Sequence, residues 1–239
     1  MKQVKKMWQF TLPELTQYLM LIAGFGLFVI LLIFVGVNIA KPDDYVLLAG
    51  FFTFFVWILF EVWGGMVHFG QTFTMIISMG RTRKEFFGAY LLCNLFNNCM
   101  KMAVIVGCVL LEKVLIGASC EGLVCETDLS SFVLDYRVIV AAVLLTLGLK
   151  MLLGVLYLKY QMTVFWILWG VTMCAVPLSN LIAKRLHNHS LNKVADFILE
   201  LARKFAAAGG FIQIMTIGII FGVLTAIAGI MTGKQAVKC

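Results

Sequence analysis

Charged residues are scarce in this sequence. Asp, Glu, Lys and Arg make up 13% of its 239 residues, whereas hydrophobic residues make up 62%. A soluble domain is closer to one quarter charged and one half apolar. One small core cannot bury this much apolar surface. The composition therefore excludes an ordinary soluble domain and favours a chain whose main solvent is lipid.

The apolar segments also lack the alternation of apolar and polar residues that is typical of barrel strands. They form long continuous runs instead. Inside a bilayer, only helices and closed barrels satisfy all backbone hydrogen bonds, and a spanning helix needs about 20 largely apolar residues. The sequence therefore predicts an all-α membrane protein.

Motifs for nucleotide binding and for hydrolysis are missing. Residues 229–234 contain a Gly-Lys pair, but the first glycine is misplaced and Gln235 stands where a phosphate-binding loop has Ser or Thr. The sequence has no His-Glu-x-x-His helix, no Cys-x-x-Cys pair and no nucleophile elbow. We therefore expect no enzymatic activity, no cofactor and no metal site in this chain.

Six apolar segments are long enough to be spanning helices: residues 18–40, 45–68, 86–111, 137–158, 163–183 and 209–231. Residues 1–16 combine lysines with aromatic residues, which predicts a helix at the inner membrane interface. These lysines also predict a cytoplasmic N-terminus, because cytoplasmic segments are enriched in Lys and Arg. We expect one domain over residues 1–239, in the cytoplasmic membrane.

A short basic turn separates the second and third predicted spans. Gly80 predicts the end of one helix, and Thr82 with Glu85 forms a capping box that predicts the start of the next. Three basic residues crowd this turn: Arg81, Arg83 and Lys84. Two interpretations are open, an ordinary positively charged cytoplasmic loop and a docking elbow for a soluble partner.

Three ionisable residues lie inside apparent spans: Glu61, Lys101 and Lys150. Such groups are costly in hydrocarbon, so they are expected to be paired or functional. At about 1.5 Å of rise per residue, Glu61 and Lys150 fall at similar depths. We expect them to pair within the bundle. The alternative is that Lys150 extends its amine toward the inner surface.

Two further patterns leave alternatives open. Asn94, Asn98 and Lys101 form one polar stripe on the third span, which would line a pathway, form a subunit interface or mark helix below the membrane. Cys120 and Cys125 lie on an acidic segment over residues 120–135, which we expect to be a water-exposed loop. They would form a small disulfide outside the cell or remain free thiols.

Residues 184–205 have apolar residues at helical spacing and charged residues on the other face. This amphipathic segment is too charged to span a bilayer. We expect it to lie on the external surface, or to re-enter shallowly, between the fifth and sixth spans.

This arrangement resembles the ABC-2 type permeases, the membrane subunits of ABC exporters with the type V architecture of the ABCA and ABCG groups. The resemblance covers the whole chain as architecture. As a motif it covers the basic turn, Gly80-Arg81-Thr82-Arg83-Lys84-Glu85-Phe86.

The resemblance implies that residues 69–85, including Ser78, form a cytoplasmic coupling helix and elbow that dock on a separate ATPase subunit. ATP and Mg would bind to that partner. A second permease subunit, identical or paralogous, would complete a dimer, and residues 184–205 would cap the exit. The implied substrate is an amphipathic or antimicrobial peptide.

Two other functions remain open. A non-transporting immunity or sensor protein would keep the same fold and basic turn. A lipid-modifying membrane enzyme would need catalytic acids or histidines clustered near an interface, and the sequence shows no such cluster.

Overall fold

The computed structural model describes residues 2–40, 44–78, 82–119, 124–171, 173 and 209–234, with side chains for 15–36, 47–78, 82–116, 128–171, 173 and 209–233. Its long helices are α1 (Lys2–Ala40), α2 (Ala49–Ser78), α3 (Arg83–Ser119), α5 (Tyr136–Tyr160) and α8 (Gly210–Lys234). A short helix α4 (Leu129–Leu134) precedes α5, and an apolar helix, Met162–Val171, follows it.

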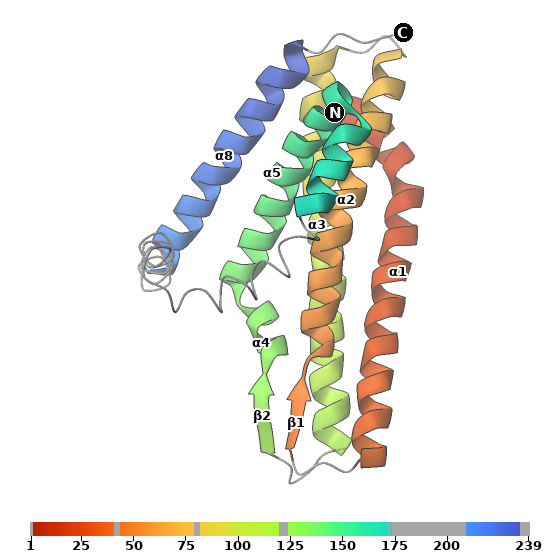
Figure 1. The fold of residues 1–239 in the computed structure, drawn as a ribbon, viewed down its shortest axis with the longest axis vertical. Coiled ribbons are helices and arrows are strands. Elements are labelled where there is room, and N and C mark those ends of the chain that lie inside the picture. The colour runs from red at the N-terminus through yellow and green to blue at the C-terminus, as the bar shows by residue number, and fades with distance from the viewer. Residues whose placement is uncertain are drawn as a thin grey trace.

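Four long helices, α1, α2, α3 and α5, run along a common axis and form an elongated bundle (Figure 1). Helix α8 packs mainly against α5 and also contacts α3. The end of α2 and the start of α3 lie at one end of the bundle, which we call the elbow end. Strands β1 (Asp44–Leu47) and β2 (Val124–Asp128) lie at the opposite end, where they pair in parallel (Figure 1).

Within the part of the chain that the structure describes, four helices are long and apolar enough to cross a membrane, over Leu15–Gly36, Ala49–Ser78, Tyr136–Tyr160 and Gly210–Gly233. Large apolar side chains on the outer faces of α1 and α8 are exposed, among them Phe28, Leu31, Phe211 and Ile219. So many exposed large apolar side chains would be costly in water. The chain is therefore a helical membrane protein in its general class.

The structure differs from the sequence prediction at the strand end. The second span was expected to begin at residue 45, but Asp44–Leu47 form β1 and α2 begins only at Ala49. The acidic segment was expected to be a loop, yet residues 124–134 form β2 and α4. Both differences have the same cause, because β1 and β2 come from distant parts of the chain and stabilise each other by pairing.

Two helix boundaries in the structure, near the start of the first predicted span and at the end of the third, also differ from the sequence prediction. Helix α1 is continuous from Lys2 to Ala40, so no break separates the expected interfacial helix from the first span. Helix α3 continues to Ser119, beyond the predicted end at residue 111, because Glu112 and Lys113, which interrupt the apolar run, both find polar partners outside α3. Residues 174–183 and the amphipathic segment 184–205 lie outside the described residues.

The core contains two large apolar clusters, one in each half of the bundle. The elbow-end cluster is centred on Phe69, Phe86 and Tyr90 from α2 and α3, whose rings meet edge to face around Phe69 at centroid distances of 5.5 and 4.9 Å. The strand-end cluster is centred on Trp57 and Ile105. The residues of α2, α3 and α5 that lie between these clusters include most of the buried charges.

Gly154 allows α2 and α5 to approach closely. A Cβ atom at this position would lie 2.5 Å from both Cβ and Cγ of Phe69, which is far inside van der Waals contact. We expect Gly154→Ala to lower the free energy of unfolding by about 1–3 kcal/mol, the usual cost of overpacking a core. Thermal unfolding in detergent measures the change. Gly222→Ala on α8 is the matched control, because a Cβ there meets no atom within 4 Å, and an equal effect of both substitutions would contradict the prediction.

Candidate functional site

The inward face of α2 carries the central residue of the site. Thr53, Trp57 and Glu61 follow one another at intervals of four and are all buried, because residues four apart share one face of a helix. The same spacing places Thr146 and Lys150 on the inner face of α5. A mostly apolar helix therefore presents one charged group to its neighbours rather than to lipid.

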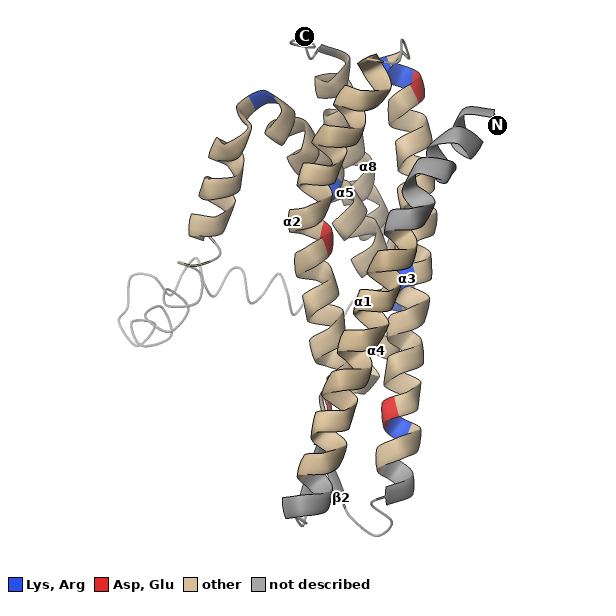
Figure 2. Ribbon diagram, turned by 90° about the vertical axis from the view of Figure 1, so that its right-hand side faces the viewer, with Lys and Arg blue, Asp and Glu red and all other residues tan. Residues whose placement is uncertain are grey.

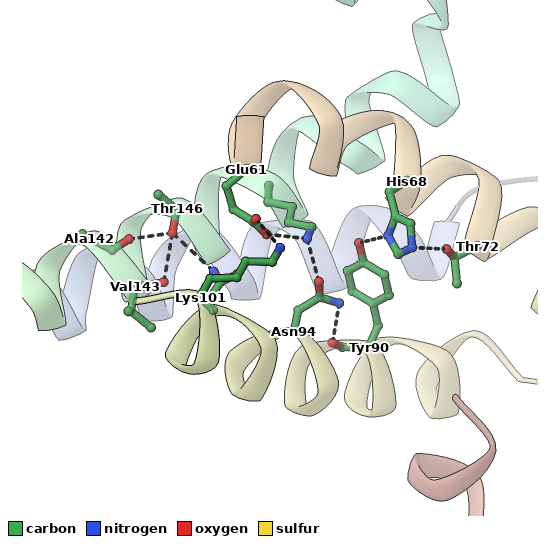
Figure 3. Close-up of polar contacts among 11 residues, drawn as sticks. Glu61, His68, Thr72, Tyr90, Asn94, Lys101, Ala142, Val143 and Thr146 are labelled. Carbon is green, nitrogen blue, oxygen red and sulfur yellow. Dashed lines mark hydrogen bonds and ion pairs between the residues drawn. The ribbon is translucent and has the colours of Figure 1, made fainter. Parts of the chain in front are cut away.

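Glu61 binds both buried lysines at once. Its Oε1 accepts a hydrogen bond from Lys150 Nζ at 2.7 Å, and its Oε2 accepts one from Lys101 Nζ at 2.6 Å. All three side chains are only 5–6% exposed. The predicted pairing of Glu61 with Lys150 is thus present in the structure, and Lys101 joins it (Figure 3). We call Glu61, Lys101 and Lys150 the ion cluster.

Amide groups of α3 extend the ion cluster. Lys150 Nζ also donates to Asn94 Oδ1 at 2.6 Å, and Asn94 Nδ2 donates to the Tyr90 carbonyl at 2.9 Å. Asn98 lies one turn away and donates from Nδ2 to Thr146 Oγ1 at 3.4 Å. The polar stripe of α3 therefore faces the bundle interior, where each residue meets a polar group of α2, α3 or α5.

Aromatic groups complete the surroundings. The Tyr90 hydroxyl lies 3.1 Å from His68 Nδ1, and His68 Nε2 lies 3.4 Å from Thr72 Oγ1. The ammonium of Lys101 stands 4.7 Å from the centroid of the Tyr18 ring, within the range of a cation–π interaction. A chain of polar contacts therefore runs through the bundle interior from Glu61 through Lys150, Asn94, Tyr90 and His68 to Thr72, and Asn98 with Thr146 forms a separate pair (Figure 3).

Gly65 makes room for Lys150 beside α2. A Cβ atom at this position would lie 2.6 Å from both Cδ and Cε of Lys150. A small cavity adjoins the ion cluster, with about 20 Å³ of space for the centre of a water-sized molecule, and its lining includes Tyr18, Gly64, His68 and Asn97. Among the described residues, no group of three His, Cys, Asp or Glu side chains could hold a metal ion.

Glu112 forms a second buried site, at the strand end. Its Oε1 accepts hydrogen bonds from the backbone N–H groups of Leu48 and Ala49, and its Oε2 accepts one from that of Gly50. The Ser130 hydroxyl donates to the same Oε2 at 2.7 Å. These backbone groups have no partner within α2, because the first N–H groups of a helix lack one. Glu112 therefore caps α2 from α3.

At the elbow end, the structure describes the last residues of α2 up to Ser78 and the chain from Thr82 onward. Thr82 accepts a hydrogen bond from Glu85 N through its Oγ1 at 3.3 Å, and Phe86 N donates to its carbonyl at 3.0 Å. The predicted helix start at Thr82 is confirmed. Arg83 Nη1 donates to the Gly233 carbonyl at 3.0 Å and so joins α3 to the last turn of α8. Lys84 is exposed, and Ser78 Oγ donates to the Met75 carbonyl at 2.6 Å.

Several predicted site residues are not covered by these contacts. Gly80, Arg81 and Cys120 lie outside the described residues, and the side chain of Cys125 is not described. The two alternatives for these cysteines, a disulfide and free thiols, thus remain sequence predictions. Among the described residues, the ion cluster and Asn94 come together, whereas the residues of the elbow lie at the end of the bundle.

Sequence reasoning missed three contributors. Tyr90 and His68 look like ordinary residues of apolar helices, and only their mutual contact shows that they continue the polar chain. Glu112 had a usable signal, because a lone carboxylate follows the long apolar run of α3. A buried charge needs a partner. This rule, which was applied to Glu61, would have identified Glu112 as a candidate site residue as well.

No family model, curated protein or solved structure matches this chain.

Proposed function

We propose that this chain is the membrane-spanning permease subunit of an ABC exporter. It moves an amphipathic substrate, best represented by an antimicrobial peptide, across the cytoplasmic membrane, while a separate subunit binds ATP and Mg and hydrolyses the ATP. The observation that carries the proposal is the basic elbow. Two long helices meet at the turn with the permease-like motif, where Thr82 fixes the start of α3 and Lys84 is exposed.

The charges at the two ends of the bundle support a cytoplasmic elbow end. Described charged residues at this end include Arg83, Lys84 and Lys159 beside one acid, Glu85, near the termini of α3 and α5. At the strand end, Asp128 and Asp135 pair with Lys113 and Arg137, and Glu112 adds a further negative charge. Figure 2 shows basic and acidic residues along the bundle. Cytoplasmic segments of membrane proteins are enriched in Lys and Arg. We propose that the N-terminus is cytoplasmic as well, on the strength of its three lysines.

Helix α3 is the natural candidate for a further span. Its 37 residues would measure about 55 Å at 1.5 Å per residue, which exceeds the thickness of a bilayer core of about 30 Å. Its residues Asn94, Asn98 and Lys101 bond inside the bundle, so lipid need not solvate them. We propose that α3 crosses the membrane and that the helix beginning at Met162 enters another span, which gives the six-span arrangement.

The size of the interior cavity bears on the substrate pathway. A space of about 20 Å³ holds roughly one water molecule and is far too small for a peptide. We therefore propose that the pathway lies between two permease subunits, identical or paralogous. The ion cluster, with Asn94 and Asn98, then holds α2, α3 and α5 together at a distance from the pathway. The alternative is that these residues line the pathway directly.

The second candidate function is a non-transporting immunity or sensor protein. It shares the bundle and the basic elbow, and it differs in having no ATPase partner. A lipid-modifying enzyme is less favoured, because the buried acid Glu61 is fully engaged by two lysines. The presence or absence of a bound ATPase therefore separates the two main candidates.

Co-purification from native membranes tests the proposal. We expect an ATP-binding subunit to co-purify with the wild-type chain, and we expect Lys84→Glu to reduce its recovery, because the change reverses an exposed charge at the elbow. Arg83 is left intact, since its bond to Gly233 also holds α8. Lys113→Glu, near the other end of α3, is the matched control and should retain the ATPase.

Two outcomes would contradict this proposal in different ways. If the wild-type chain recovers no ATPase under conditions that preserve membrane complexes, the proposed transporter lacks its ATP-hydrolysing subunit. The immunity or sensor function is then favoured. If Lys84→Glu retains as much ATPase as Lys113→Glu, an ATPase is present but it does not dock on Lys84.

A further inference from the structure

The cavity beside the ion cluster has the size and lining of a site for a single water molecule. It offers about 20 Å³ to the centre of a water-sized molecule, and about 10–15 Å³ by this measure is enough for one water. Its lining comes from four helices and includes Tyr18 of α1, Gly64 of α2, Asn97 of α3 and Lys150 of α5. A bound water also needs two or more polar partners, and the lining supplies them.

One of these partners is a buried acceptor. Asn97 is 7% exposed, and its Oδ1 is buried with no hydrogen-bond partner within the protein. A buried acceptor that has lost its hydrogen bond to water lowers stability, so native structures rarely leave one unpaired. Asn97 borders the cavity, where a molecule that can donate a hydrogen bond would satisfy this oxygen.

The other partner is a donor. The ammonium of Lys150 has three N–H groups, of which one donates to Glu61 Oε1 and another to Asn94 Oδ1. A third N–H group is therefore available on the same cavity wall. A metal cation is disfavoured next to two ammonium groups. An anion is disfavoured next to Asn97 Oδ1, because neither group can donate a hydrogen bond to the other.

We propose that this cavity binds one water molecule, which accepts a hydrogen bond from Lys150 Nζ and donates one to Asn97 Oδ1. His68 borders the same cavity, so the water also lies between the ion cluster and the chain from Tyr90 through His68 to Thr72. The water then links Asn97 to the polar contacts of α2, α3 and α5. This inference is independent of the proposed transport function.

Two substitutions test the water by its effect on the melting temperature in detergent. Asn97→Leu removes the acceptor at similar volume. It should lower the melting temperature if water satisfies Oδ1, and it should raise it if Oδ1 is unpaired, since an unsatisfied polar atom is then removed. The second outcome would overturn the proposal.

Gly64→Ala narrows the cavity without a clash, because its nearest neighbour would be the Tyr18 hydroxyl at 3.6 Å. Ala normally stabilises a helix relative to Gly, and Gly107→Ala, which meets no atom within 4 Å, is the matched control. Displacement of a bound water should make Gly64→Ala less stable than this control, whereas an equal gain in both would count against the water.

A density map of the wild-type protein that resolves ordered water decides the matter even if the variants fold poorly. Density within hydrogen-bonding distance of both Asn97 Oδ1 and Lys150 Nζ supports the proposal. An empty cavity, or an ion in place of water, overturns it.

Discussion

Glu61→Gln is expected to destabilise the protein by about 3–5 kcal/mol, the usual cost of removing one member of a buried ion pair. The substitution keeps the shape of the side chain and removes its negative charge. Lys101 and Lys150, both about 5% exposed, would then lose the carboxylate that each contacts at 2.6–2.7 Å. An ammonium group without a counter-charge is far more costly in a membrane bundle than in water.

Thermal unfolding in detergent, followed by tryptophan fluorescence, measures this loss. Glu85→Gln is the matched control, because Glu85 is exposed in the first turn of α3 and surface charges contribute about 0–1 kcal/mol. A Glu61→Gln variant as stable as the Glu85→Gln variant would show that the ion cluster does not need its carboxylate. Lys150→Met should cost less, because Lys101 still pairs with Glu61.

A triple substitution distinguishes the cost of an unpaired charge from the cost of altered packing. Replacing Glu61, Lys101 and Lys150 together by Met removes all three charges and leaves none unpaired. Buried ion pairs can often be replaced by apolar residues at little cost, so the triple variant should be more stable than Glu61→Gln alone. If it is no more stable, the loss in the single variant comes from packing and not from unpaired charge.

The second large effect is expected for Glu112→Ala, which should lower the free energy of unfolding by about 2–4 kcal/mol. It removes the acceptor of three backbone N–H groups at the start of α2 and of the Ser130 hydroxyl. Each buried donor without an acceptor costs about 1–3 kcal/mol, and water that enters at the helix end offsets part of the sum. The negative charge at a helix N-terminus is lost as well.

Hydrogen exchange provides a local readout for this substitution. Amides of residues 48–50 should exchange much faster in Glu112→Ala, while those near Glu61 should be less affected. Lys113→Ala is the matched control. It removes only the ion pair with Asp128 at 2.9 Å, whose side chains are about one third exposed, and such pairs contribute about 0–1 kcal/mol. Unchanged protection at residues 48–50 in Glu112→Ala would contradict the capping role.

The sequence predicted the class of the protein and several local features. Long apolar runs indicated membrane-spanning helices, and four helices of the structure have the length and composition to span. The start of α3 at Thr82 followed from a capping box, which depends on residues three apart. The pairing of Glu61 with Lys150 could be anticipated, because hydrocarbon cannot solvate either charge.

Only the tertiary structure decided which residues complete these sites. The cap on α2 joins groups 62–64 positions apart in the chain, and the parallel pairing of β1 with β2 joins segments separated by the whole of α2 and α3. The contact between His68 and Tyr90 depends on how α2 and α3 are rotated toward each other. Helical periodicity determines which residues share a face, but the packing of the whole bundle determines which face meets which. For this reason the sequence alone could indicate that Glu61 needs a partner, and only the packed helices supplied both lysines, Asn94 and the small cavity beside them.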